Sequence, residues 1–133
     1  MARFKMEQIK IDQFAVLSEK TNGELNISTS LSIGVNKELL LVSVQLGINY
    51  IEQGELKVIL KITCIFSVHP DDWQQMQTGD KVIFPKSFLS HLAMHTFGTA
   101  RGIMYCKTEN TQYQRYLLPP TNVDALIQKD LEA

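Results

Sequence analysis

The stretch LLVSVQLGINYIEQGELKVILKITCIFSV, residues 40–68, contains two runs in which apolar residues occupy every second position. An alternation with period two places one apolar row on one face of a β-strand. The turn signal Glu52-Gln53-Gly54 separates the runs and leaves no room for a crossover helix, so the strands should pair antiparallel. The two rows are Leu40, Val42, Val44, Leu46, Ile48 and Tyr50, and then Leu56, Val58, Leu60, Ile62, Cys64, Phe66 and Val68.

Two further alternating blocks precede this pair. Residues 25–35 form a clear row from Leu25 to Val35, whereas residues 5–16 form a weaker one. Thr21-Asn22-Gly23 and Asn36-Lys37 provide turn residues between the blocks. The sequence therefore predicts a four-stranded antiparallel sheet of meander type, with one apolar face that other elements must cover.

The period changes after Val68, where helical signals begin. Residues 69–76 predict a short helix with acidic residues in its first turn, and a longer helix should begin at Pro85 and end at Gly98. Residues 101–118 could extend that helix, but a hairpin of 102–107 and 113–118 is preferred because two helical glycines would cost about 1 kcal/mol each. A final short helix should follow Asn122. The predicted fold class is α+β, a single domain over residues 1–133 with helices on one face of the sheet.

The composition excludes several functional classes. Thirteen basic and fourteen acidic residues give a net charge of -1, so no single-sign field attracts nucleic acid. No apolar stretch approaches the roughly 20 residues of a membrane span, and no signal peptide is expected at the start of the chain. Cys64 and Cys106 are expected to be free thiols, which favours the cytoplasm.

The sequence offers no convincing catalytic or metal site. His91 and His95 have the spacing that can place two imidazoles on one metal ion, but no third ligand is evident nearby. Ser87 and Ser90 are neighbours of His91 in sequence, yet adjacent residues on a helix do not face each other. We therefore expect no catalytic residues, no metal, no cofactor and no enzymatic activity.

Apolar side chains concentrate after the sheet. Most of them should pack on the sheet, and an exposed remainder would mark a protein-binding or oligomer surface. These residues are Phe84, Phe88, Phe97, Tyr105, Tyr113, Tyr116, Leu117 and Leu118.

Two motifs in this region resemble the SecB export chaperones. Phe84-Pro85 opens the long predicted helix, and Leu118-Pro119-Pro120-Thr121-Asn122-Val123-Asp124-Ala125-Leu126 leads into the last one. SecB chaperones have a helix that begins at Phe-Pro, and a Leu-x-Pro-x-Asn-hydrophobic-Asp-Ala-Leu motif after it. The resemblance extends over nearly the whole chain in the order of elements.

The resemblance implies a holdase that binds unfolded or extended apolar polypeptides without nucleotide. It further implies a homo-oligomer, a dimer or a tetramer built as a dimer of dimers. No membrane insertion is expected, because no apolar stretch is long enough. The client-binding positions carried over from the motifs are Phe84, Leu118 and Pro120. Their neighbours Phe88, Tyr116 and Leu117 complete the expected client-binding set.

The partner remains open between two classes. SecB chaperones are strongly acidic and dock on a translocation ATPase, whereas this chain is nearly neutral. An antitoxin client, as in chaperone-controlled toxin–antitoxin systems, is therefore at least as well supported as protein export. Two alternatives from other classes are a carrier of a small apolar ligand, with a cavity lined by Phe66, Phe88 and Met94, and a non-catalytic regulatory subunit of a larger assembly.

Overall fold

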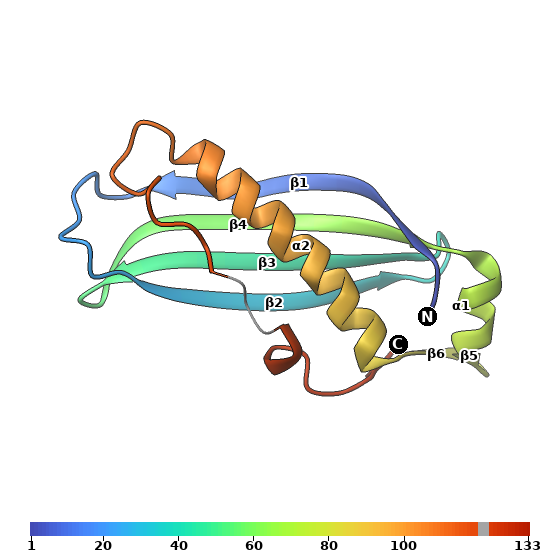
Figure 1. Ribbon diagram of the computed structural model, residues 1–133. Helices are drawn as coiled ribbons and strands as arrows, with labels where there is room; N and C mark the ends of the chain where they lie inside the picture. The colour runs from blue at the N-terminus through green and yellow to red at the C-terminus, as the bar shows by residue number, and fades with distance from the viewer. Residues whose placement is uncertain (120–122) are drawn as a thin grey trace.

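The computed structural model describes residues 1–119 and 123–133 and contains a four-stranded antiparallel sheet (Figure 1). Its strands are β1 (Phe4–Val16), β2 (Asn26–Asn36), β3 (Leu41–Glu52) and β4 (Glu55–Val68). The apolar rows of β3 and β4 lie on one face and are almost completely buried from Val42 to Val68. The α+β class and the antiparallel sheet are thus confirmed.

The strand order corrects one part of the predicted meander. The order is β1-β4-β3-β2, so β2, β3 and β4 form a meander but β1 pairs with β4 at the other edge. This Greek-key arrangement is feasible because residues 17–25 can extend about 30 Å, whereas crossing the sheet needs roughly 14 Å. The Glu52 carboxylate holds this loop by accepting hydrogen bonds from Thr21 Oγ1 at 2.5 Å and Asn22 N at 2.9 Å.

Two bulges explain why the first strand has a weak apolar pattern. The register of β1 against β4 shifts between Met6 and Gln8 and again between Ile11 and Gln13, which leaves Glu7 and Asp12 as the extra residues. The bulges bring the large apolar residues of β1 opposite the buried row of β4. The resulting pairs are Phe4 with Val68, Met6 with Phe66, Ile9 with Cys64, Ile11 with Ile62, Phe14 with Leu60, and Val16 with Val58.

The bulge residues themselves make hydrogen bonds with β4 on the polar face of the sheet. Ser67 Oγ donates to Glu7 Oε1 at 2.7 Å, and Thr63 Oγ1 donates to Asp12 Oδ2 at 2.5 Å. The two acidic residues of β1 therefore lie on the face opposite the apolar rows.

The long helix α2 (Lys86–Lys107) corrects the prediction of a helix ending at Gly98 and the prediction of a hairpin after it. It crosses the apolar face of the sheet diagonally (Figure 1). The helix continues past Gly98 because Ala100 and Met104 extend the row of buried side chains on its sheet-facing side, with exposures of 0% and 2%. Burial of these side chains outweighs the cost of helical glycine, about 1 kcal/mol at each position.

Shorter elements close the end of the sheet at which β1 begins. Helix α1 (Pro70–Met76), close to the predicted residues 69–76, is N-capped by His69. The strands β5 (Gln77–Thr78), β6 (Lys81–Phe84) and β7 (Leu131–Glu132) form a small second sheet.

The last predicted helix is reduced to the 3-10 turn η1 (Val123–Ala125). The chain beyond this turn pairs with β6, because the N–H groups of Val82 and Ala133 each donate to the other residue's carbonyl. Asn122, the predicted helix cap, lies outside the described residues.

The bulges predict different effects for two single-residue deletions in β1. Removing Asp12 restores regular alternation at the second bulge and keeps every large apolar side chain on the core face, so we expect a loss of about 1 kcal/mol from its hydrogen bonds. Removing Lys10 turns Phe4, Met6 and Ile9 toward the polar face. That change should cost at least about 3 kcal/mol.

Urea unfolding of both deletion variants measures this difference. Equal losses of unfolding free energy, or a larger loss for the Asp12 deletion, would show that the bulges do not set the register.

An ion pair attaches the start of the chain to α1. Asp72 Oδ2 accepts hydrogen bonds from Arg3 N and Arg3 Nε, both at 2.8 Å. The pKa of the Asp72 carboxyl is lowered to about 2, mainly by the hydrogen bond from the Arg3 side chain and next by the one from the Arg3 backbone N–H.

Because an Asp in an unfolded chain has a pKa of about 3.9, acidification protonates the unfolded state first. The free energy of unfolding should therefore fall as the pH decreases from about 4 to 2. Asp72→Asn should remove this part of the pH dependence in urea titrations, and Arg3→Gln should reduce it. A slope in Asp72→Asn identical to that of the wild type would contradict the assignment.

Candidate functional site

An open apolar groove lies between the middle of β1 and the C-terminal half of α2. Its volume is about 450 Å³. The lining residues are Ile11, Gly98, Thr99, Gly102, Ile103, Cys106 and Lys107.

The groove exists because α2 has glycines, which lack side chains, at positions where larger residues would fill the space. A Cβ built at Gly98 or Gly102 would meet no heavy atom within 4 Å. Ile9 and Ile11 consequently remain 48% and 46% exposed although they face the same side as the fully buried row of β4. The apolar face of the sheet is left partly uncovered at its β1 edge.

The lining of the groove includes one thiol, that of Cys106. The Cys106 thiol is exposed and makes no hydrogen bond within the described part of the chain. Cys64, the other thiol, is buried, and burial raises its pKa. Residues 1–119 and 123–133 contain no group of three His, Cys, Asp or Glu side chains placed to hold a metal ion.

The two histidines of α2 pack on β1. The rings of His91 and His95 are 5.2 Å apart, and each ring lies 5.5 Å from the ring of Phe4. They extend the aromatic cluster at the start of β1.

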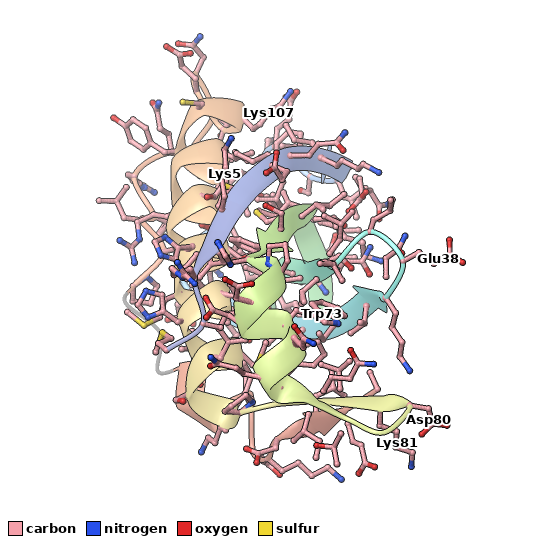
Figure 2. The ribbon with its side chains drawn as sticks, turned by 90° about the vertical axis from the view of Figure 1, so that its right-hand side faces the viewer. Lys5, Glu38, Trp73, Asp80, Lys81 and Lys107 are labelled. Atoms are coloured by element: carbon pink, nitrogen blue, oxygen red, sulfur yellow. The ribbon has the colours of Figure 1, made fainter. Side chains whose placement is uncertain are left out.

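The predicted client-binding residues separate into two groups at opposite ends of the sheet. Phe84 and Phe88 stack with ring centroids 6.3 Å apart at the start of α2 and are 0% and 1% exposed. Phe88 also lies 6.0 Å from Phe4, which pairs with the last residue of β4. These two phenylalanines belong to the core of the protomer, where Trp73 packs on Phe84. Trp73 is labelled in Figure 2.

The second group lies at the other end of the strands. Tyr50 Oη donates to the Tyr116 carbonyl at 3.0 Å, and burial raises the pKa of Tyr50 to about 12. Leu118 is 4% exposed, whereas its neighbour Leu117 is 62% exposed. Pro120 lies outside the described residues. Among the described members of the predicted set, only Leu117 offers a largely exposed apolar side chain.

The ligand cavity predicted for the carrier alternative is not formed by its three predicted residues. Phe66 and Phe88 are buried in the core, but Met94 is 59% exposed. These three side chains therefore do not enclose a cavity together.

The sequence contains a signal for the groove within the long helix. Gly98, Gly102 and Cys106 recur every four residues and so fall on one face of a helix. That signal requires the helix to continue past Gly98, whereas a glycine after a periodic run is more often a helix end. Ile11 could not be predicted as a groove residue, because the two bulges weaken the apolar alternation of β1 and hide which of its residues share a face.

The open space beside the two glycines predicts a stabilising substitution. Gly98→Ala and Gly102→Ala should each raise the free energy of unfolding by about 0.5–1 kcal/mol, since alanine favours helix and has room here. Gly79→Ala is the matched control, because Gly79 also has free space but a φ of +65° that disfavours alanine.

Thermal and urea unfolding measure these changes. If both α2 variants were destabilised like the Gly79→Ala control, the space beside Gly98 and Gly102 would not be open, which would contradict the prediction.

Comparisons with known proteins bear on the fold. No protein-family model matches the chain, and no curated protein matches it. No helix within the described residues is long and apolar enough to cross a membrane.

Two solved structures are similar to this one. One is the SecB-like chaperone Rv1957 of Mycobacterium tuberculosis in complex with a ChAD peptide from the HigA1 antitoxin, with a TM-score of 0.50, 15% identity, and coverage of 90% of this chain and 84% of that chain. The other is a protein of unknown function from Streptococcus agalactiae, with a TM-score of 0.42, 13% identity, and coverage of 82% and 90%. The first likeness shows that this chain has a fold shared with a SecB-like chaperone.

Proposed function

We propose that this protein is a SecB-like chaperone that holds unfolded or extended apolar polypeptide segments and catalyses no reaction. The observation that carries the proposal is the groove in which Ile11 remains half exposed beside two helical glycines, with Ile9 half exposed on the same face of β1. The groove is open to solvent, which suits a passing polypeptide. A small ligand needs a site that buries most of its surface. The fold shared with a chaperone in complex with an antitoxin peptide supports the same choice.

The energetics favour weak, reversible holding. Covering the exposed halves of Ile9 and Ile11 contributes roughly 2–3 kcal/mol, so a client must contact the protein beyond this groove. Burying about 1,000 Å² of apolar client surface gives a gross gain of about 25 kcal/mol. Ordering an unfolded client offsets most of this gain. The client is therefore held without being driven into one fixed structure.

The natural client and the assembly belong to the same proposal. An antitoxin is the favoured client class, and delivery to a translocation ATPase is the second option, both in the cytoplasm. We propose a homo-oligomer, a dimer or a tetramer, because both β1 and β2 leave one long strand edge unpaired. Native mass spectrometry of the purified protein measures the oligomeric state, and a monomer at micromolar concentration would contradict this part.

Filling the groove should abolish holding without unfolding the protein. Gly102→Leu places a side chain in the open space between α2 and Ile11, so it should weaken binding of an unfolded client at least tenfold. The melting temperature should stay at or above that of the wild type, because leucine is a better helix former than glycine. Light scattering of a reduced, aggregating model substrate measures the protection.

Ser87→Leu is the matched control in the same helix, since Ser87 is exposed but lies far from the groove at the start of α2. This control should protect the substrate like the wild type. If Gly102→Leu protects equally well while folded, the client does not use the groove.

A further inference from the structure

The helix that forms one wall of the groove contains no acidic residue. Among the 22 residues of α2 there are three cations, Lys86, Arg101 and Lys107, and no Asp or Glu. The remaining residues hold ten basic and fourteen acidic side chains, because the whole chain has thirteen and fourteen. The near-neutral total therefore conceals a positive helix on an otherwise negative protein.

The cations in the C-terminal half of α2 have no partner within the described part of the chain. Arg101 Nε is buried without a hydrogen-bond partner, and Lys107 forms no ion pair. The other two arginines differ, since Arg3 pairs with Asp72 and Arg115 lies over the ring of Tyr116. Glu109, the acidic residue nearest to Lys107 in sequence, is exposed and forms no ion pair with it.

The opposite wall is also free of carboxylates, for a structural reason. The bulges of β1 turn Glu7 and Asp12 to the polar face, where Ser67 and Thr63 donate hydrogen bonds to them. Lys107 is consequently the one charged residue among those that line the groove. Figure 2 shows it on the β1 side of the molecule, opposite the hairpin tip with Asp80 and Lys81.

Two simpler explanations account for less. A lysine in the last turn of a helix interacts favourably with the helix dipole, which explains Lys107 alone but not the absence of acidic groups from both walls. A second copy of α2 seated on the same face would bring like charges together, which disfavours that occupant. An apolar segment that ends in a carboxylate matches both parts of the groove: the segment contacts the apolar lining, and the carboxylate pairs with the cation.

We propose that the groove selects apolar polypeptide segments that carry an acidic side chain at the Lys107 end. This inference rests on the proposed function, because it names the class of client segment held in the same groove. Lys107 is the specificity-determining residue, since its ammonium group forms an ion pair with the client carboxylate beside a desolvated apolar contact.

The test uses the full-length protein and three fluorescent 12-residue peptides with one apolar core. The peptides have two Glu, two Gln or two Lys residues at the end of that core, and both termini are blocked. Fluorescence anisotropy at low salt should show the Glu peptide binding at least fivefold more tightly than the Gln peptide, and the Lys peptide binding most weakly. Raising the salt concentration should reduce the advantage of the Glu peptide because ion pairs at exposed sites are screened.

Charge reversal assigns the preference to one residue. Lys107→Glu should invert the order of the Glu and Lys peptides, and Lys107→Gln should bring the three affinities within about twofold. Lys129→Glu is the matched control, because Lys129 is exposed outside the groove and should keep the wild-type order. Circular dichroism confirms that each variant is folded.

The outcomes separate this inference from the proposed function. Equal affinities for the three peptides, or an order unchanged in Lys107→Glu, would overturn the acidic preference while the holdase function stands. Failure of every peptide to bind, together with no protection of an aggregating substrate, would overturn both.

Discussion

The antiparallel pairing of β1 with β4 determines which surface of the sheet is available. β1 has too many residues for a regular match with the buried row of β4, and the bulges at Glu7 and Asp12 absorb the excess. As a result the large apolar side chains of β1 share one face, and its acidic residues face the other way. The central strands β3 and β4 are then buried on the apolar face, while β1 forms an edge whose covering depends on α2.

The coverage of that edge is limited by the helix rather than by the strand. α2 packs its stripe of Phe88, Leu92, Phe97 and Met104 on the sheet, but Gly98 and Gly102, which have no side chains, leave the middle of β1 open. A protein selected for stability alone would gain about 1 kcal/mol from alanine at each glycine. The open edge is the surface at which we propose that a polypeptide binds.

The sequence predicted the elements whose pattern is local and repeated. Strands β2, β3 and β4 and the start of α2 have strong periodicity, and the SecB-like order of elements agrees with the structural likeness to a SecB-like chaperone. The position of β1 at the far edge could not be predicted, because the loop of residues 17–25 is long enough to reach either edge. The extent of α2 was mispredicted because tertiary burial of Ala100 and Met104 overrides the helix-ending signal of Gly98.

The groove depends on both the edge position of β1 and the full length of α2, which the sequence did not predict. Hydrogen–deuterium exchange tests most directly whether a client binds there. The exchange of backbone amides should be compared between the free protein and the protein with an excess of a reduced, unfolded model client. The account predicts slower exchange of the amides in residues 8–12 and 98–107 in the presence of the client. Unchanged exchange in both segments, with slowing confined to other parts of the chain, would contradict it.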